Sequence, residues 1–201
     1  MKRDRIPDFQ RRRFMTTAAV SPLIVATGGL VPDTALAATP SCGDEATPPQ
    51  TAGPFFKPDS PSRTSLIEPG AQGEQLQLTG QILSTSCQPV SGVLIDFWHC
   101  DTSGNYDNRG YRFRGHQFSD AQGAFTLDTL MPGLYPGRTR HIHVIVQAPN
   151  RRPLTTQLYF PGEALNDRDW IFDPVLLMDI ETAGKQRNAQ FDFVLDLGRS
   201  A

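Results

Sequence analysis

The sequence is poor in the residues and patterns that mark several classes of protein. Its 201 residues include only three cysteines, four histidines and two tryptophans, and no internal repeat is present. Basic residues (19) nearly balance acidic ones (21), and no Lys/Arg-rich stripe follows the first residues, which argues against nucleic acid as a partner. With 20% charged residues, the chain is not disordered as a whole. Helical spacing is also lacking, so the sequence predicts a folded domain that is not a helical bundle.

The first residues carry the features of an export signal. Arg11-Arg12-Arg13-Phe14 contains the Arg-Arg-x-Phe core of twin-arginine signals, and Ala35-Leu36-Ala37 offers a cleavage site. A membrane anchor is the alternative, but Ser, Thr, Gly and Pro dilute the uncharged stretch between them, so no stable membrane anchor is expected. We predict that residues 1–37 direct export by the twin-arginine route, to the periplasm or outside the cell, and are then removed.

All three cysteines, Cys42, Cys87 and Cys100, follow this leader. An oxidising compartment permits one disulfide and leaves one thiol over. Cys100 closes an apolar strand, where a buried thiol is common, whereas the other two lie in polar, turn-like segments. A Cys42–Cys87 disulfide is therefore predicted, with no disulfide at all as the alternative.

Short segments of alternating apolar and polar residues dominate the remainder. After an unpatterned segment rich in Pro, Ser and Thr, a period of two begins at Gln75. The pattern predicts strands from residue 75 and over residues 93–98, 124–127, 142–146, 155–160 and 191–197, with a short helical turn within residues 162–170. These elements predict an all-β fold, an antiparallel β-sandwich with a prealbumin-like core. An extended N-terminal arm (residues 38–74) is expected to precede a sandwich domain (residues 75–201).

Two of the four histidines, His141 and His143, lie two residues apart on a predicted strand. Side chains at i and i+2 of a strand point the same way, so the pair presents two imidazoles as half of a metal site. A cupin-type site or a zinc hydrolase would add a nearby carboxylate or a third histidine, and residues 144–148 offer no carboxylate. His99 is interpreted as a satisfied structural histidine, and His116 as part of a solvated loop.

Two of the four tyrosines are placed where they can supply further ligands. Tyr135 follows a Pro-Gly turn just before the histidine strand, and Tyr106 ends a polar segment after another predicted strand. Phenolate oxygen is a hard, strongly donating ligand that suits ferric iron. The alternative is that Tyr135 only covers the core, as in non-catalytic prealbumin-like modules. Tyr111 and Tyr159 are interpreted as structural.

Four ordered motifs give the chain a specific resemblance. Gly92-Val-Leu-Ile-Asp-Phe-Trp-His-Cys-Asp101, followed by Gly104-Asn-Tyr106, resembles the first signature of the intradiol ring-cleavage dioxygenases. Residues 125–143, with Pro-Gly-Leu-Tyr and Arg-Thr-Arg-His-Ile-His, and residues 154–162 resemble the central and third signatures. Thr51-Ala-Gly-Pro-Phe-Phe56 matches the Thr-x-Gly-Pro-aromatic element of the family's N-terminal arm.

The resemblance implies a mononuclear non-haem Fe(III) bound by four side chains, Tyr106, Tyr135, His141 and His143. It also implies a catalytic role for Tyr135, as the ligand that leaves the iron when substrate binds. The family's arginine, three residues before the first histidine, corresponds to Arg138, which would stabilise negative charge on the substrate ring. The family's glutamine corresponds to Gln157, which would orient the substrate or the bound oxygen.

Two positions depart from the family pattern. Thr139 stands where proline is usual, and Arg140 where a small residue is usual. These departures affect the expected shape of the pocket wall more than the metal. The Phe55-Phe56 pair of the arm is expected to form part of that wall.

The implied reaction cleaves a catechol-type ring between its two hydroxyl-bearing carbons. It incorporates both atoms of O2 and gives a cis,cis-muconate-type diacid. The chain length resembles one subunit of protocatechuate 3,4-dioxygenase, which favours a protocatechuate-like substrate over catechol, hydroxyquinol or a lignin-derived fragment. Whether the chain forms a homo-oligomer or a hetero-oligomer is left open. A non-catalytic prealbumin-like binding module is the alternative function.

Overall fold

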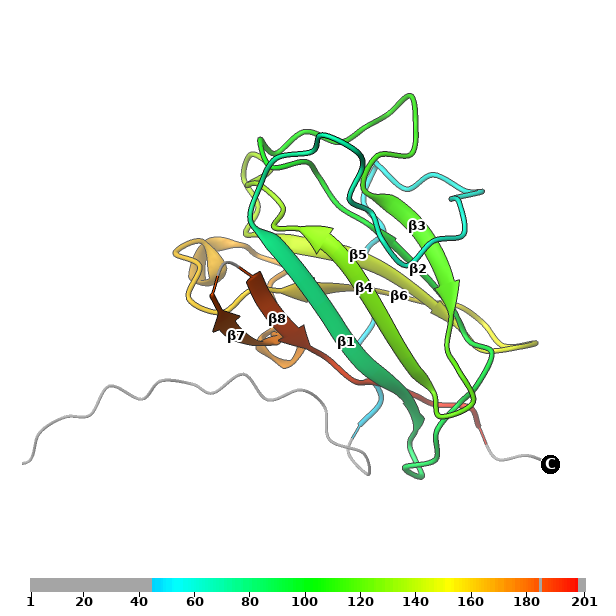
Figure 1. The fold of residues 1–201 in the computed structure, drawn as a ribbon. Coiled ribbons are helices and arrows are strands. Elements are labelled where there is room, and N and C mark those ends of the chain that lie inside the picture. Colours follow the sequence, from blue (N-terminus) through cyan, green and yellow to red (C-terminus); the bar gives the residue numbers. More distant parts are fainter. Residues whose placement is uncertain (1–44, 185, 199–201) are drawn as a thin grey trace, which may run out of the picture. The chain divides into compact units, whose positions relative to one another are not determined.

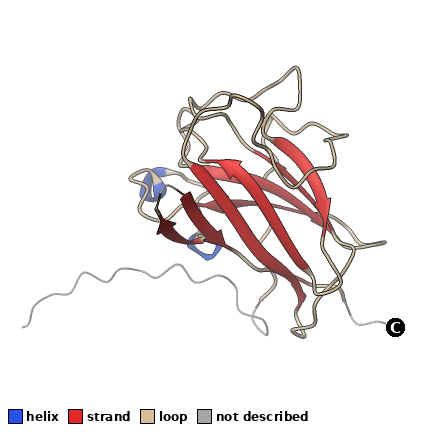
Figure 2. Cartoon of the chain, viewed as in Figure 1, coloured by secondary structure: helices blue, strands red, loops and turns tan. Residues whose placement is uncertain are grey.

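Two β-sheets face each other in the computed structural model, which describes residues 45–184 and 186–198 (Figure 1). The predicted leader and Cys42 lie outside these residues. Among the described residues, no helix is long and apolar enough to cross a membrane. Strands and loops make up nearly all of this part of the chain, and its only helices are two 3-10 turns, η1 (Asn166–Arg168) and η2 (Pro174–Leu176) (Figure 2).

The first sheet is built around its longest strand, β1 (Gln75–Ser84). β4 (Ala124–Leu130) pairs with one edge of β1 in antiparallel fashion. The other edge of β1 pairs in parallel, first with β8 (Gln186–Gln190) and then with β9 (Phe193–Leu195). β7 (Asp179–Ala183) completes the sheet by pairing antiparallel with β8. The sheet is therefore mixed, which a hydrophobic alternation does not reveal.

The second sheet is antiparallel throughout, in the order β3-β2-β5-β6. Its strands are β2 (Leu94–Trp98), β3 (Arg114–Phe118), β5 (His141–Gln147) and β6 (Leu154–Tyr159). β5 lies between β2 and β6, so both histidines of the predicted metal site stand on an interior strand.

Alternate positions of the two sheets fill the core between them. On β5, Ile142, Val144 and Val146 belong to this core and are buried. Because successive side chains of a strand point to opposite faces, His141 and His143 project from the other face of the sheet. The same alternation that builds the core therefore presents the histidine pair on the outer face.

The N-terminal arm covers that outer face. Near one end, Gln50 N donates to Thr155 O of β6 at 2.7 Å. Farther along, Arg63 N donates to His116 O of β3 at 2.9 Å, and Leu66 then enters the core. The arm thus runs from the β6 edge to the β3 edge and passes over β5 and β2.

The sandwich and its arm agree with the prediction, and η1 lies within the predicted helical turn. The prediction of a loop at His116 is wrong, because this residue lies in β3 and donates from Nδ1 to Ser60 O at 2.7 Å. β3 buries Arg114 and exposes Phe118, so it carries no apolar alternation. β7 and β8 are also missing from the prediction, because most of their residues are at least partly exposed.

Candidate metal centre

The predicted ligands and catalytic residues meet on the outer face of the four-stranded sheet. His143 of β5 pairs in register with Trp98 of β2 on one side and with Gln157 of β6 on the other. His141 pairs with Tyr159 of β6 in the same way. Directly opposed residues on neighbouring strands point to the same side, so the register itself gathers these side chains.

Two loops bring the tyrosines to the histidines. Tyr106, in the β2–β3 loop, places its Oη 3.2 Å from His141 Nε2. The ring centroid of Tyr106 lies 5.7 Å from that of Tyr135 and 6.1 Å from that of His143. The two imidazole centroids are 4.8 Å apart, with planes at 84°. Two phenols and two imidazoles from three separate segments therefore form one cluster.

Close backbone packing holds the two tyrosine loops together. Gly104 has a φ of +86°, and a Cβ there would collide with the carbonyl of Leu134 beside Tyr135. Gly133 N donates to Asp101 O at 2.8 Å across the same contact. Only glycine allows the loops to approach this closely without strain, which explains the Gly-x-Tyr spacing of the Tyr106 segment.

The arm closes over the cluster with aromatic side chains. Phe55 stacks on Tyr106 with ring centroids 4.3 Å apart, and it meets Tyr135 edge-on at 5.3 Å. Phe56 packs edge-on against Trp98 at 5.1 Å. The Phe55-Phe56 pair therefore contacts both candidate phenol ligands and the indole beside them.

Hydrogen bonding and burial set the protonation state of the imidazoles. His141 Nδ1 lies 2.6 Å from Thr139 O, and because a carbonyl only accepts, Nδ1 carries the proton and Nε2 keeps its lone pair. Burial lowers the pKa of His141 to about 4. Burial, followed by the neighbouring His141, also lowers the pKa of His143. Both rings are neutral near pH 7, which is the form that binds a metal ion.

The residues present fit a ferric ion. His143 is buried, and its Nδ1 has no hydrogen-bond partner among the described residues, so the protein leaves a nitrogen of this ring unsatisfied. Burial raises the pKa of the Tyr106 hydroxyl above its usual value, so a nearby cation is needed to hold it as a phenolate. Two of the four predicted ligands are tyrosines, whose phenolate oxygen is a hard donor suited to Fe(III).

A buried carboxylate organises the two predicted catalytic side chains beside the cluster. Arg138 donates from Nε to Asp169 Oδ2 and from Nη2 to Gln157 Oε1, each at 2.8 Å. Gln157 Nε2 donates in turn to Thr51 O of the arm at 2.9 Å. Asp169 is absent from the sequence-based prediction. It lies 31 residues beyond Arg138 in a loop without a motif, so no local signal identifies it.

Thr139 and Arg140, which depart from the family pattern, both bind the loop after β6. Thr139 has the amide that a proline would lack, and this N–H donates to Asp169 Oδ2 at 2.9 Å. Its Oγ1 lies 2.6 Å from Asn166 Oδ1. Arg140 pairs with Glu163 at 2.6 Å and donates to the carbonyl of Pro132. The side-chain hydrogen bonds of Thr139 and Arg140 therefore go to Asn166, Glu163 and Pro132 and not to the tyrosine and histidine cluster.

The other polar residues near the site have ordinary structural partners. His99 donates from Nδ1 to Cys100 O and accepts at Nε2 from Thr129 Oγ1, each at 2.7 Å, as expected of a satisfied structural histidine. Asp96 accepts from Ser60 Oγ at 2.8 Å. The hydroxyl of Tyr159 donates to Gln50 Oε1 at 2.9 Å and lies 3.3 Å from Gln157 Oε1.

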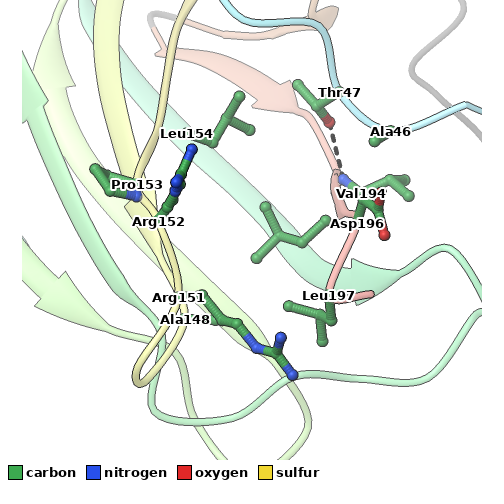
Figure 3. A pocket seen from close by; sticks show the side chains of 11 residues that line it. Ala46, Thr47, Ala148, Arg151, Arg152, Pro153, Leu154, Val194, Asp196 and Leu197 are labelled. Atoms are coloured by element: carbon green, nitrogen blue, oxygen red, sulfur yellow. Dashed lines mark hydrogen bonds between the residues drawn. The ribbon is translucent and has the colours of Figure 1, made fainter. Parts of the chain in front are cut away.

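A cavity of about 210 Å³ lies at the opposite end of β5 from His141 (Figure 3). The start of the arm, the β5–β6 turn and β9 form its walls. It is lined by Ala46, Thr47, Ala148, Arg151, Arg152, Pro153, Leu154, Val194, Leu195, Asp196 and Leu197. None of the predicted ligands or catalytic residues lines it, so this cavity is separate from the metal cluster.

Comparison with known proteins gives consistent matches. The family model described as Dioxygenase matches residues 52–197, which include all four predicted ligands. Chlorocatechol 1,2-dioxygenase of Rhodococcus opacus is 29% identical over 58% of this chain and 57% of its own length. Hydroxyquinol 1,2-dioxygenase of Nocardioides simplex is 31% identical over 64% and 52%. The chain therefore spans little more than half the length of these curated relatives.

Solved structures include a more similar protein. The dioxygenase domain of a dioxygenase and carbohydrate-binding protein fusion from Streptomyces sp. SirexAA-E is 57% identical, with a TM-score of 0.75, over 77% of this chain and 100% of that one. The 3-chlorocatechol 1,2-dioxygenase from Rhodococcus opacus 1CP is 26% identical, with a TM-score of 0.70, over 75% of this chain and 73% of that one.

Proposed function

We propose a function from one premise: the chain belongs to the intradiol ring-cleavage dioxygenase family. The protein acts as an Fe(III)-dependent enzyme that cleaves a catechol-type ring between its two hydroxyl-bearing carbons with O2. The product is a cis,cis-muconate-type diacid. One observation carries the proposal, the cluster formed by Tyr106, Tyr135, His141 and His143 under the arm.

These four side chains would hold the iron. When bound, Fe(III) supplies a Lewis acid that draws charge from both catechol oxygens and sets their orientation. The two imidazoles are neutral already, so only the two phenols have to release a proton on binding the metal. The donor set then carries two negative charges, which suits a ferric rather than a ferrous ion.

The two tyrosines differ in how firmly they are held. Tyr106 stacks face to face on Phe55, whereas the side-chain contacts of Tyr135 within the described residues are edge-on aromatic ones. Tyr135 also stands in a turn and is partly exposed. We therefore assign Tyr135 the role of the phenol that would take up a proton at Oη when a catechol binds, and Tyr106 the role of the phenol that would keep its place.

Arg138 and Gln157 would act beside the substrate ring. The guanidinium of Arg138 is fixed at two points, so its positive charge is preorganised for negative charge that develops on the ring. Loss of one such preorganised donor typically costs about 3 kcal/mol of transition-state stabilisation. Gln157 is bonded at both amide atoms, to Arg138 and to Thr51 O, which defines the orientation that it presents to substrate.

The particular catechol is a narrower proposal. We place protocatechuate first, and beside it catechol, chlorocatechol and hydroxyquinol. All four appear in the names of relatives, including the protocatechuate 3,4-dioxygenase beta chain of Burkholderia cepacia, which is 28% identical over 64% of this chain. Oxygen uptake with this panel ranks the substrates by kcat/KM.

The visible absorption spectrum tests the reaction class. The iron-loaded protein is expected to be wine-red from tyrosine-to-Fe(III) charge transfer, and its band should move to longer wavelength when catechol is added without oxygen. Oxygen should then bleach the complex and release the diacid. A protein that stays colourless after reconstitution with iron would overturn the proposal and leave a prealbumin-like binding module.

A matched pair of histidine variants localises the colour to the cluster. His143→Ala removes a proposed ligand and should abolish the band and the activity. His116→Ala removes a histidine that bonds to Ser60 on β3 and should retain both. A band of equal strength in the two variants would place the iron elsewhere.

A further inference from the structure

We infer that Asp169 is a positioning residue for this reaction, acting through Arg138 and Thr139; the inference rests on the proposed function. None of the hydrogen bonds of the Asp169 side chain goes to a proposed iron ligand. Its carboxylate accepts from Arg138 Nε at 2.8 Å and from Thr139 N at 2.9 Å, both on Oδ2. Its other oxygen, Oδ1, accepts from Ile171 N at 3.3 Å.

The Asp169 carboxylate is buried, and both of its oxygens are hydrogen-bonded within the protein. Its side chain is 1% exposed, whereas that of Arg138 is 17% exposed. A buried carboxylate is tolerated when a cation and further donors compensate it, and here one guanidinium and two backbone amides do so. The charge on Asp169 therefore depends on Arg138, and the placement of Arg138 depends on Asp169.

The geometry shows what Asp169 does for Arg138. A guanidinium is a planar fork, and this fork is bonded at Nε to Asp169 and at Nη2 to Gln157. Two bonds in one plane fix both its position and its rotation. Without the carboxylate, the guanidinium loses its bond at Nε while the bond to Gln157 remains, and the group can turn more freely about its stem. Such a rotation would move the positive charge of Arg138, and this lowers catalysis when charge on the substrate has to be stabilised at one defined place.

Asp169 also reaches a ligand through Thr139. The Thr139 amide donates to Asp169, and the Thr139 carbonyl accepts from His141 Nδ1 at 2.6 Å. The backbone of Thr139 is thereby hydrogen-bonded at both its N–H and its carbonyl, to the Asp169 carboxylate and to the proposed ligand His141 respectively. A proline at this position would lack the first of these bonds, so this coupling depends on the threonine found in this chain.

The test is Asp169→Asn, which keeps the shape and removes the charge. We expect kcat to fall about tenfold or more while KM changes less than about threefold, because transition-state stabilisation is lost and substrate chelation is not. The iron–tyrosinate band should persist, because both phenol ligands are untouched. Asp167→Asn, an exposed acid two residues earlier in η1, is the matched control and should behave as wild type.

A double-mutant cycle separates positioning from general stabilisation. In an Arg138→Ala background, Asp169→Asn should cause no further loss of kcat, because the group that it positions is already gone. In the iron-free protein, the double variant should melt at a higher temperature than Arg138→Ala alone, since it no longer buries an unpaired charge. Asp169→Glu retains the charge and should recover part of the kcat that Asp169→Asn loses.

The outcomes discriminate between this inference and the proposed function. An active wild type whose Asp169→Asn variant keeps its kcat would overturn the role of Asp169 and leave the function intact. Additive losses of kcat in the cycle would overturn positioning through Arg138. A wild type that neither binds iron nor cleaves any catechol would overturn the proposed function, and the role of Asp169 with it.

Discussion

Tyr106 Oη lies 3.2 Å from His141 Nε2, and these are two of the atoms proposed to bind iron. Because His141 Nδ1–H is committed to Thr139 O, the phenol is the donor in this contact. The metal-free site therefore holds one proton between two proposed ligand atoms. Iron binding would release this proton, and affinity for iron should rise with pH.

Tyr106→Phe tests this relationship directly. It removes one ligand oxygen and the hydrogen bond but keeps the ring on which Phe55 stacks. Iron affinity should fall at least about tenfold, and the visible band should weaken, as followed by titration with Fe(III) and chelator competition. Tyr111→Phe is the control, since its hydroxyl donates to Pro58 O at 3.0 Å. Equal affinities in the two variants would contradict the assignment of Tyr106.

Gly53→Ala should alter the metal centre from the arm. Gly53 has a φ of +64°, and a Cβ there would lie 3.4 Å from His143 Cε1 and 3.8 Å from Nε2. Gly92→Ala is a matched control, with a φ of +66° and nothing within 4 Å of its added Cβ. Both should lose about 1–2 kcal/mol of unfolding free energy, from the left-handed backbone. Only the methyl group of Gly53→Ala comes into contact with His143, so only that variant should also shift the visible band, and identical spectra of the two variants would contradict this prediction.

His99 should make the iron-free protein less stable in acid. Burial lowers the pKa of His99 to about 4 in the folded state, against an ordinary value of 6.5. Between these values the unfolded chain binds more protons than the folded protein. The contribution of His99 to the unfolding free energy is therefore fully present above pH 6.5 and is lost as the pH falls towards 4. The contribution is roughly 3 kcal/mol. Urea unfolding of His99→Asn across this window should show a shallower pH dependence than wild type, and parallel curves would refute the prediction.

A Cys42–Cys87 disulfide remains a prediction with a geometric basis. Thr47 N donates to Val194 O at 2.9 Å, and Thr85 N donates to Leu195 O at 3.2 Å. The start of the arm and the turn of Cys87 therefore flank consecutive residues of β9. A second bond between the arm and this strand, from Val194 N to Thr47 Oγ1 at 2.8 Å, is drawn in Figure 3. The five residues from Thr47 back to Cys42 can span up to about 17 Å.

Mass spectrometry of the oxidised protein decides whether this bridge forms. A tryptic pair joined through Cys42 and Cys87 should appear without reductant and separate with it. Cys100→Ser should leave the pair intact, because the Cys100 thiol is buried and donates to Gly133 O at 3.4 Å. Full alkylation of Cys42 in the folded, oxidised protein would disprove the bridge.

Export is proposed from the leader alone. Replacing Arg11 and Arg12 together by lysine keeps the charge and removes the twin-arginine core. The variant should accumulate inside the cell at the precursor mass, whereas wild type should be found outside the cytoplasm without residues 1–37. Equal export of both proteins, measured by fractionation and mass, would refute the twin-arginine route.

The strands with a clear period of two could be predicted, and those without it could not. β1 and β5 can be recognised in the sequence because one face of each strand packs into the core. Their alternating apolar residues include Leu76 and Leu78 of β1 and Ile142 and Val144 of β5. In β3 a buried Arg114 and an exposed Phe118 reverse the usual pattern, so nothing in the local sequence marks it as a strand. The Arg114 side chain donates to Asp107 O, and Arg63 of the arm, 51 residues away, donates to Arg114 O, so its burial depends in part on contacts outside a local window.

The sequence by itself determined the alternation of β5, and with it the fact that His141 and His143 share one face, because strand geometry is local. Its motifs also determined the family and the residue types of the proposed donor set. Only the tertiary structure decided that Tyr106 meets His141, that the arm lies over His143, and that Asp169 holds Arg138. Each of these contacts joins residues more than thirty positions apart, so it depends on how loops return to the sheet and on no local preference.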